Sequence, residues 1–262
     1  MSAAALPAAR ELARRHRAQW WEALPWVAGI AAFFLFPNYL AFGTQLLVTI
    51  LFALSLDLVL GYAGIVTLGH AAFFGAGAYT VGMLAAHWGW NEPLSGLAAA
   101  ALVAGAVGLL SGWVLLRTHG LTLLMLTLCT MALLEQAANM FSEFTGGFDG
   151  MPGLAFRPLL GLFDFDVLFF RSQYLYALAV LFLGFVLVRV LVYSPFGRSL
   201  TGIRENLLRM HAVGAPVRAR QVLVYGISAA LAGVAGAVFV QATGYVNLAV
   251  LGLERAAGVL II

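Results

Sequence analysis

Three ionisable side chains within apolar stretches are the first candidates for chemistry. Asp57, His70 and Glu135 each lie among runs of apolar residues. An ionisable group is costly in hydrocarbon, so each should face protein or water, where it could relay protons or meet a charged substrate group. Glu135 begins a polar stripe at helical spacing toward the predicted outer mouth. Such a stripe would suit a vestibule in which Glu135 could meet a substrate ammonium group. The stripe consists of Glu135, Asn139, Ser142 and Glu143. The alternative is that each group is hydrogen-bonded to a neighbouring helix or, for a carboxyl, protonated.

Enzymatic chemistry has no supporting pattern. The sequence contains no histidine cluster, no metal-ligand spacing and no nucleophile with a nearby base, and Ser228 and Cys129 are isolated. A single cysteine cannot form an intrachain disulfide. All 14 basic residues are arginine, whereas a Walker A loop requires a lysine to hold nucleotide phosphates. We therefore expect no catalytic residue, metal or cofactor in this chain, with any ATP bound by a separate subunit.

The composition indicates that these side chains lie in a lipid bilayer. Of the 262 residues, 63% are hydrophobic and 10% are charged, whereas a soluble domain has about 45–50% apolar and about 25% charged residues. The apolar excess requires an apolar solvent in addition to an apolar core. The formal net charge of +3 records membrane orientation and does not indicate a nucleic-acid partner.

Apolar stretches predict an all-α polytopic membrane protein with about 7–8 transmembrane helices, since a bilayer core takes roughly 20 residues per helix. They lie near residues 25–41, 43–60, 65–86, 96–116, 120–140, 173–192 and 221–241, and a further one begins near residue 255. Pro37 and Asn38 interrupt the first stretch, which could be short, kinked or re-entrant. A cleavable signal peptide is the alternative for this stretch, but no small-x-small cleavage site follows it.

The arginines predict the topology, because cytoplasmic loops retain positive charge. A cytoplasmic N-terminus places most of them at the inner face, whereas the reverse orientation would place most of them outside. The inner set is Arg10, Arg14, Arg15, Arg17, Arg117, Arg189, Arg198, Arg204, Arg209, Arg218 and Arg220, and the outer set is Arg157, Arg171 and Arg255. We expect a basic cytoplasmic tail over 1–23 and one transmembrane domain over 24–262, with an external loop at 141–172 and a cytoplasmic loop at 193–220.

Glycine and other small residues recur where helices should pack. Two stripes at four-residue spacing predict close helix contacts in the bilayer. They are Ala104, Gly108 and Gly112, and Ala229, Gly233 and Ala237. The segment 61–79 is also dense in glycine, at a cost of about 1 kcal/mol per helical position relative to Ala. Close helix crossing explains this density, and so does an unwound helix lining a substrate path.

The predicted cytoplasmic loop contains a helical pattern of its own. Pro195 and Gly197 should end the sixth stretch, and Gly214 and Pro216 end the pattern. The apolar residues between them recur at roughly helical spacing and are Leu200, Ile203, Leu207, Leu208 and Met210, with Arg204, Glu205 and Arg209 on the polar side. We expect a short amphipathic helix that lies on lipid headgroups or docks on a cytoplasmic partner.

Several of these blocks, taken in order, resemble one protein family. They are 61–79, the Arg117-Thr-His-Gly120 turn and the residues after it to Leu128, Thr145 to Gly150, 194–214 and 227–237. From about residue 44 to the end, the chain is similar to the branched-chain amino-acid permeases of bacterial ABC importers, specifically the subunit that pairs with a second, related permease. Three departures from the family pattern are Thr67 in place of Ser, Leu121 and Thr122 in place of an aromatic pair, and an end at Ile262, where we expect the sequence to be truncated.

The resemblance implies a permease in the bacterial inner membrane, without enzymatic activity. Its implied partners are a second permease subunit, cytoplasmic ATPase subunits, a periplasmic substrate-binding protein and membrane lipid. The substrates would be branched-chain or other apolar amino acids, and urea or short amides are the alternative within the family. A secondary transporter driven by protons or sodium, with Asp57, His70 and Glu135 as its relay, is the alternative from another class.

The resemblance also suggests roles for individual residues. Coupling to the ATPase would involve Arg204, Glu205, Gly214, Pro195 and Gly197. The substrate pathway would involve Gly61, Gly64, Thr67, Gly69, His70, Phe73, Gly77, Tyr79 and Glu135. The external loop would meet the binding protein through Thr145, Gly146, Gly147, Asp149 and Gly150.

Overall fold

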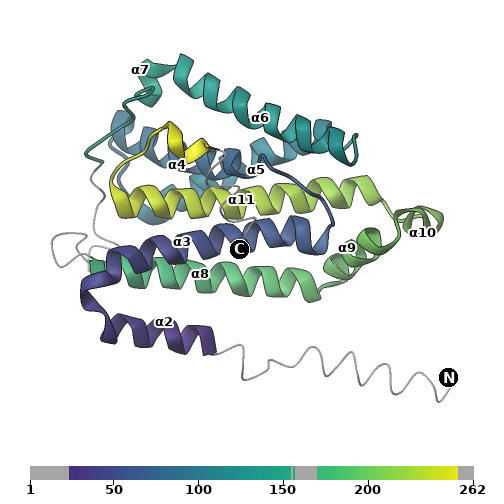
Figure 1. Ribbon diagram of the computed structural model, residues 1–262, viewed down its shortest axis with the longest axis horizontal. Coiled ribbons are helices and arrows are strands. Elements are labelled where there is room, and N and C mark those ends of the chain that lie inside the picture. The colour runs from purple at the N-terminus through teal and green to yellow at the C-terminus, as the bar shows by residue number, and fades with distance from the viewer. Residues whose placement is uncertain (1–23, 155, 157–169, 253–262) are drawn as a thin grey trace. The chain divides into compact units, whose positions relative to one another are not determined.

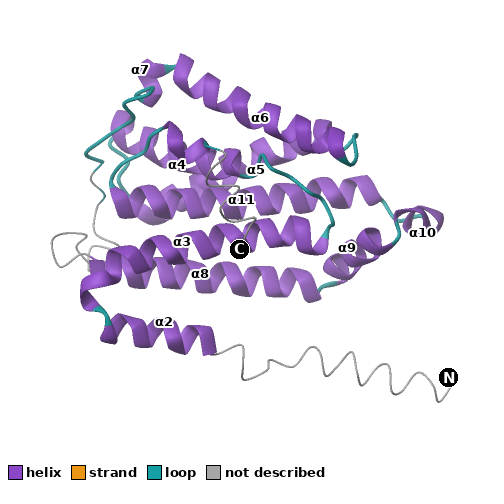
Figure 2. Ribbon diagram, viewed as in Figure 1, coloured by secondary structure: helices purple, strands orange, loops and turns teal. Residues whose placement is uncertain are grey.

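The computed structural model describes residues 24–154, 156 and 170–252, and all regular elements in this part of the chain are helices (Figure 2). The predicted all-α class is therefore confirmed. The predicted tail at 1–23 and the stretch near residue 255 lie outside the described residues. The chain divides into two units, Met1–Leu40 and Ala41–Ile262.

The helices follow the predicted stretches in order. The longer helices are α2 (Leu24–Leu35), α3 (Leu40–Asp57), α4 (Ala71–Trp88), α5 (Pro93–Leu115), α6 (Leu121–Met140), α8 (Phe170–Tyr193) and α11 (Val217–Thr243). The shorter ones are η2 (Pro37–Tyr39), the π-helix η3 (Leu58–Tyr62), α7 (Ser142–Thr145), α9 (Pro195–Glu205), α10 (Leu207–Ala212) and η4 (Leu248–Leu251). Among the described residues, five helical segments are long and apolar enough to cross a bilayer, namely Pro37–Tyr62, Pro93–Leu115, Leu121–Met140, Arg171–Tyr193 and Val217–Thr243.

The first unit confirms the predicted interruption. Helix α2 has 12 residues, fewer than the roughly 20 that a bilayer core requires. The helix ends at Leu35, and Pro37 then opens the three-residue helix η2, since a proline ring is tolerated in the first turn of a helix but not inside one.

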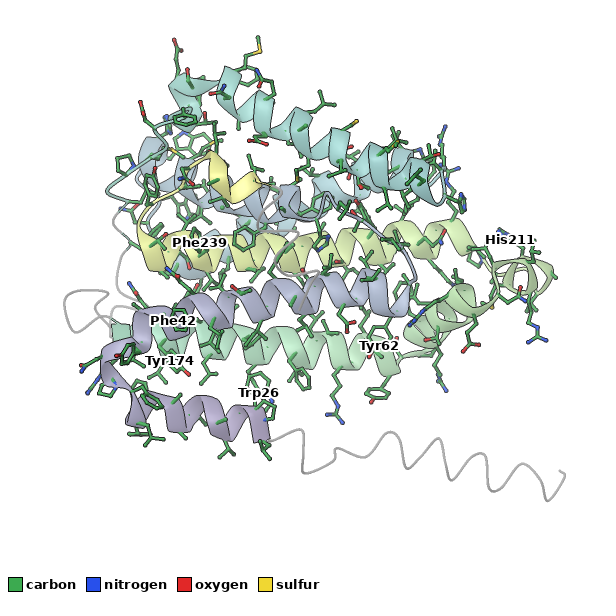
Figure 3. The ribbon with its side chains drawn as sticks, viewed as in Figure 1. Trp26, Phe42, Tyr62, Tyr174, His211 and Phe239 are labelled. Atoms are coloured by element: carbon green, nitrogen blue, oxygen red, sulfur yellow. The ribbon has the colours of Figure 1, made fainter. Side chains whose placement is uncertain are left out.

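In the second unit, α9 and α10 lie at one end and α7 lies at the opposite end (Figure 1). We call these the α9 end and the α7 end. Tyr62 and His211 lie toward the α9 end, whereas Phe42, Tyr174 and Phe239 lie toward the α7 end (Figure 3). Arg218 ties α11 to α5 near the α9 end, where its guanidinium donates to the carbonyl of Trp113 over 2.9 Å and stacks on the ring.

Helix α11 forms the core of this unit, because α4 and α5 both pack on it through small residues. A Cβ added to Gly77 would overlap the backbone of Gly233, and one added to Gly108 would overlap Ala229. Gly233 in turn contacts Ala104, so the two predicted stripes pack against each other. This packing confirms the prediction that the two stripes form close helix contacts.

A buried amide joins three helices near the α7 end. Tyr176 of α8 donates its hydroxyl to Gln241 Oε1 over 2.6 Å, and Gln241 Nε2 donates to the carbonyl of Pro93 over 3.0 Å. Both hydrogen bonds are buried, where leaving either partner unpaired costs about 1–3 kcal/mol.

The third predicted helix starts later than expected. The prediction placed it at 65–86, but α4 begins at Ala71, and residues 63–70 form an irregular segment. The chain turns at Gly64, whose φ of 69° favours glycine. The amide of Leu68 then donates to Thr127 Oγ1 over 3.4 Å, and Gly69 lies directly against the Thr127 backbone. A side chain at position 69 would push this segment away from α6. Local hydropathy does not register this contact with a distant helix, so it placed the helix start too early.

Candidate functional site

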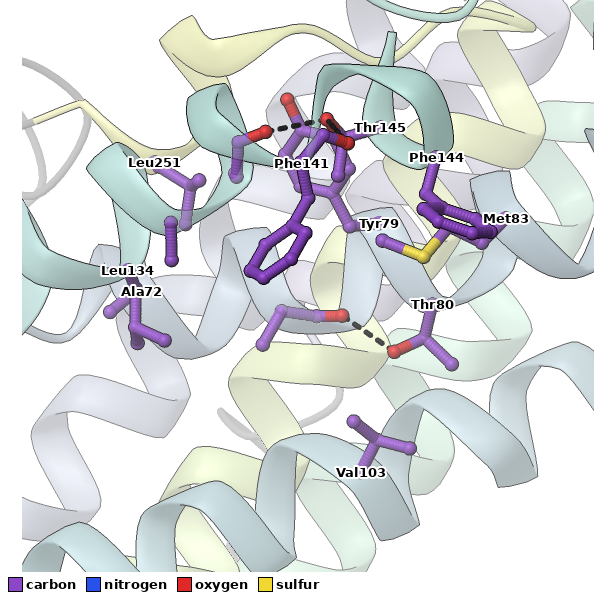
Figure 4. Close-up of a pocket in the computed structure, with 13 residues that line it drawn as sticks. Ala72, Tyr79, Thr80, Met83, Val103, Leu134, Phe141, Phe144, Thr145 and Leu251 are labelled. Carbon is purple, nitrogen blue, oxygen red and sulfur yellow. Dashed lines mark hydrogen bonds between the residues drawn. The ribbon is translucent and has the colours of Figure 1, made fainter. Parts of the chain in front are cut away.

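A cavity of about 450 Å³ lies between α4, α5 and α6 toward the α7 end (Figure 4). We call it the α4–α6 cavity. Its lining is mostly aliphatic and aromatic, with polar groups from Tyr79, Thr80 and Thr145. The lining residues are Ala72, Ala76, Tyr79, Thr80, Met83, Val103, Leu134, Ala137, Ala138, Phe141, Phe144, Thr145 and Leu251. An apolar cavity with a few polar groups is the usual form of a small-molecule site.

Among the polar groups of this cavity, the Tyr79 hydroxyl is the one without a partner in the described part of the chain. It is buried and has no hydrogen bond there, whereas Thr80 donates to the carbonyl of Ala76 over 2.7 Å. Thr145 donates to the carbonyl of Ala138 over 2.5 Å. The Glu135 carboxylate is close enough to Tyr79 to interact with it electrostatically. A ligand in the cavity could therefore find a hydroxyl that has no hydrogen bond within the described residues, with the Glu135 carboxyl group nearby.

The loop predicted to be external is anchored at the edge of the cavity. Thr145 is buried and its hydroxyl accepts the amide of Gly147 over 3.2 Å. Met151 pairs with Val246 in an antiparallel bridge, with the Met151 amide donating to the Val246 carbonyl over 2.9 Å. Gly150 lies against that same carbonyl, and Gly146, Gly147 and Gly150 all have positive φ. The predicted glycines therefore shape this loop, whereas Asp149 is exposed at its surface.

The predicted coupling residue Arg204 contacts the glycine-dense segment. Its guanidinium donates to the carbonyl of Gly61. A Cβ added to Gly64 would lie 2.9 Å from Arg204 Cγ. Gly61 and Gly64, assigned to the pathway, and Arg204, assigned to coupling, thus form one contact between α9 and the segment from η3 to the turn at Gly64. Gly64 also lines a cavity of about 170 Å³ with Thr118, His119 and Gln221.

Instead of the single amphipathic helix predicted for the cytoplasmic loop, there are two helices. Asn206 breaks the pattern with φ −154° and ψ 96°, and its side chain accepts the Arg209 amide as the N-cap of α10. Leu200 and Ile203 of α9 are buried, as expected, but Leu208 of α10 is 81% exposed. The predicted apolar face therefore holds for α9, whereas in α10 Leu207 and Met210 are half-buried and only Leu208 departs from the prediction.

Pro195 and Gly197 act at the start of α9. Helix α8 ends at Tyr193, in agreement with the prediction, but both residues belong to α9. Ser194 is the N-cap and accepts the Gly197 amide over 3.3 Å. Gly197 lies against the carbonyls of Leu191 and Val192, so the absence of a side chain permits the sharp corner between α8 and α9.

His70 is fully buried between α3, α4 and α11. The Ser55 hydroxyl donates to the carbonyl of Phe52 over 2.6 Å, and the Ser228 hydroxyl donates to the carbonyl of Ser55 over 2.5 Å. His70 Nε2 lies 3.0 Å from Ser55 Oγ and 3.3 Å from Ser228 Oγ. The tautomer protonated at Nε2 suits these contacts, because it lets the imidazole donate to the serines while both hydroxyls donate to carbonyls. His70 thereby clamps the start of α4 to its neighbours.

The three groups of the alternative ion relay have separate surroundings. His70 contacts the two serines, Glu135 lies near Tyr79, and the Asp57 carboxylate lies against Gly61. Thr67 and Phe73 are buried with His70 in the core. Of the predicted pathway residues, Tyr79 lines the α4–α6 cavity, and Gly69 and Gly77 occupy close helix contacts.

The amino-acid sequence of the chain matches a known protein family. Residues 38–262 match the family described as "Branched-chain amino acid transport system / permease component". The chain belongs to this permease family. The high-affinity branched-chain amino acid transport system permease protein LivM of Escherichia coli (strain K12) is 29% identical over 228 residues, which cover 78% of this chain and 52% of LivM. LivM of Salmonella typhimurium (strain LT2) matches to the same extent.

The chain spans about half the length of these curated relatives. No solved structure matches it. The family and the apolar helices together make this permease an integral membrane protein.

Sequence reasoning missed several exposed residues of this permease that could meet a partner. Phe148 is 84% exposed beside Asp149, and Val213 is 77% exposed beside Gly214. Both are large apolar side chains in glycine-rich loops, and Leu208 of helix α10 is similarly exposed. An exposed apolar side chain in a loop indicates a possible contact surface, and counting apolar residues along the sequence does not reveal which of them are exposed.

Proposed function

We propose that this chain is the permease subunit of a bacterial ABC importer that carries branched-chain or other apolar amino acids across the inner membrane. A separate ATPase subunit would supply the energy, a second related permease would complete the channel, and a periplasmic binding protein would deliver the substrate. The contact between Arg204 and Gly61 carries this proposal, because it joins the loop that would meet the ATPase to η3, which leads through the irregular residues 63–70 into α4.

The two ends of the second unit supply the two docking surfaces. At the α9 end, Glu205, Leu208 and Gly214 are exposed, so an ATPase groove could bind α10 and its flanks. At the α7 end, Phe148 and Asp149 are exposed on a loop fixed by the Met151 bridge. A binding protein that docks there lies beside the α4–α6 cavity, which Thr145 of the same loop lines.

Transport would proceed by alternating access. Closure of the ATPase subunits moves α10 and α9, and Arg204 transfers that movement to the turn at Gly61 and Gly64. Residues 63–70 are irregular and lie against α6 at Thr127. A shift of this segment relative to α6 would open or close the inner side of the path.

Reconstituted vesicles test the proposal. The chain is incorporated with the second permease and the ATPase subunits, the binding protein is added outside, and uptake of radiolabelled leucine is measured with and without internal ATP. We expect uptake that requires ATP and every subunit, with isoleucine and valine as competitors. Uptake driven by a proton or sodium gradient without the ATPase would instead support the secondary transporter, and competition only by urea or acetamide would identify an amide permease.

A further inference from the structure

Glu135 of α6 has a carboxyl group for which the described part of the chain provides no partner. The residue is half-buried in a segment long and apolar enough to cross a bilayer. The described residues give its carboxyl group no hydrogen bond and no ion pair. An ionisable group in a membrane helix usually pairs with another group or faces a cavity, and it commonly marks a substrate or ion path.

Glu135 lies at the edge of the α4–α6 cavity. Its neighbour Leu134 and Ala138, one turn further along α6, both line the cavity. Tyr79 lines the same cavity from α4 and is close enough to Glu135 for an electrostatic interaction. The carboxyl group and the Tyr79 hydroxyl therefore flank one part of the cavity.

Tyr79 supplies a second unpaired polar group at this place. Its side chain is 4% exposed, and its hydroxyl makes no hydrogen bond to Glu135 or to any other described residue. A polar group held away from water without a partner is costly. A ligand that offers a positive donor to the carboxyl group and an acceptor to the hydroxyl would satisfy both.

The rest of the cavity is a wall of apolar side chains (Figure 4). Met83, Val103, Leu134 and Leu251 contribute to it from three helices and η4. The volume of about 450 Å³ lies in the range of sites that enclose small molecules. Two polar groups beside an apolar wall match a molecule with a compact charged head and an aliphatic side chain.

Other occupants match only part of this arrangement. A lipid acyl chain would cover the apolar wall but would place hydrocarbon against the Glu135 carboxyl group and the Tyr79 hydroxyl. Urea and acetamide have no positive charge for Glu135, and they are too small and polar for the wall. A free amino acid with an aliphatic side chain meets all three requirements.

We propose that the α4–α6 cavity binds the amino acid during its passage, with the ammonium group at Glu135, the carboxylate accepting the Tyr79 hydroxyl and the aliphatic side chain on the apolar wall. The inference rests on the proposed function, which supplies an apolar amino acid as the substrate. It adds a binding site within the membrane, and it makes the free amino group a requirement that amides do not meet.

Ligand binding by the purified transporter tests the site. The chain, the second permease and the ATPase subunits are kept together in detergent without the binding protein, and the midpoint temperature of unfolding is followed as ligand is added. The ligands are leucine, isoamylamine, which lacks the carboxylate, leucic acid, in which a hydroxyl replaces the ammonium group, and acetamide. We expect leucine to raise the midpoint most and acetamide to leave it unchanged. Equal effects of leucine and leucic acid would overturn the proposal.

Two variants assign the two polar contacts. Glu135→Gln should weaken binding of leucine and isoamylamine by about tenfold or more, since a charge-assisted hydrogen bond is lost. Tyr79→Phe should weaken leucine but not isoamylamine, which has no carboxylate to accept the hydroxyl. Glu92→Gln is the control, because it removes an exposed carboxyl group outside the cavity and should change neither affinity. Unchanged leucine affinity in Glu135→Gln would contradict the assignment.

Folding and function are separated by two further readouts. Glu135→Gln removes an unpaired carboxyl group, so its midpoint without ligand should not fall, and a loss of binding then reports the site itself. ATP-driven uptake of leucine that Glu135→Gln leaves unchanged would reject this site alone. Absence of ATP-driven uptake by the unaltered complete system would reject the proposed function.

Discussion

Arg204 is the side chain that joins the loop at the α9 end to the helical core. Its guanidinium reaches the carbonyl of Gly61, 143 positions earlier in the chain. A guanidinium can hold a carbonyl and keep its charge because it is not deprotonated in proteins. The aliphatic part of Arg204 lies on Gly64, so this one side chain makes a polar and an apolar contact with the same turn.

Arg204→Ala should uncouple transport. Removal of both contacts leaves α9 free to move without the turn, so we expect uptake to fall roughly tenfold while ATP hydrolysis by the complex continues. Both rates are measured in the same reconstituted vesicles. Arg198→Ala, which removes an exposed arginine from the same helix, is the control and should leave the ratio of uptake to hydrolysis unchanged. Equal ratios for the two variants would show that the contact transmits nothing.

Tyr79→Phe should separate stability from transport. The Tyr79 hydroxyl is buried without a partner in the described residues, so its removal should not lower the free energy of unfolding and should raise it by about 1 kcal/mol. Uptake should fall if substrate uses this hydroxyl in the α4–α6 cavity. Tyr176→Phe provides the contrast, since loss of its bond to Gln241 should destabilise the protein by about 1–3 kcal/mol. Full uptake by Tyr79→Phe would remove Tyr79 from the pathway.

At the scale of elements, the crossing of α4 and α11 depends on direct backbone contact. Gly77 meets Gly233, and Gly236 meets the carbonyl of Phe74. Lipid provides no hydrophobic force between helices, so this contact holds them through dispersion and close approach. The glycine density of the third stretch therefore has a packing explanation at this position.

Gly77→Ala should destabilise the protein by about 1–3 kcal/mol, because the new methyl group would overlap backbone atoms and force the helices apart. Thermal unfolding in detergent measures this as a lower midpoint temperature. Gly105→Ala is the matched variant, since its Cβ would lie 3.3 Å from Ala230 Cβ, where a small adjustment suffices. Midpoints lowered equally by both substitutions would contradict the account of this crossing.

Gly214 sets the connection between α10 and α11. Its φ is 79°, and a Cβ added there would meet no atom within 4 Å. Strain from the backbone alone, about 1–2 kcal/mol, should therefore make Gly214→Ala shift α10 and reduce the ratio of uptake to ATP hydrolysis. Asparagine tolerates this conformation better than alanine, so Gly214→Asn should retain more coupling. The reverse order of the two variants would mean that the left-handed turn is not what matters.

At the scale of the whole molecule, the described arginines are distributed unevenly between the ends of the second unit. Arg198, Arg204 and Arg209 belong to α9 and α10, and Arg218 and Arg220 lie in the first turn of α11, which follows α10. Arg117 lies between α5 and α6, whereas Arg171 lies in the first turn of α8, which ends next to α9. Short cytoplasmic segments retain arginine. The α9 end should therefore face the cytoplasm.

Labelling of single cysteines should verify this orientation. In a Cys129→Ala background, His211→Cys lies at the α9 end and Phe148→Cys in the loop that follows α7. A membrane-impermeant maleimide should label position 148 in right-side-out vesicles and position 211 in inverted vesicles. Labelling of position 211 from outside would reverse the topology and remove the proposed ATPase surface from the cytoplasm.

The sequence by itself determined the all-α membrane class, the order of the helices and the two small-residue stripes. These features are local, because hydropathy and four-residue spacing are read within one helix length. The interruption at Pro37 is also a local feature, since a proline restricts its own backbone.

Only the tertiary structure decided how distant segments meet. The late start of α4 depends on Thr127, the corner at Gly197 on the carbonyls of α8, and the role of Arg204 on a carbonyl far earlier in the chain. The α4–α6 cavity likewise joins residues from four helices and η4. Hydropathy averages each segment over its own neighbours, so contacts between segments remain invisible until the helices are packed.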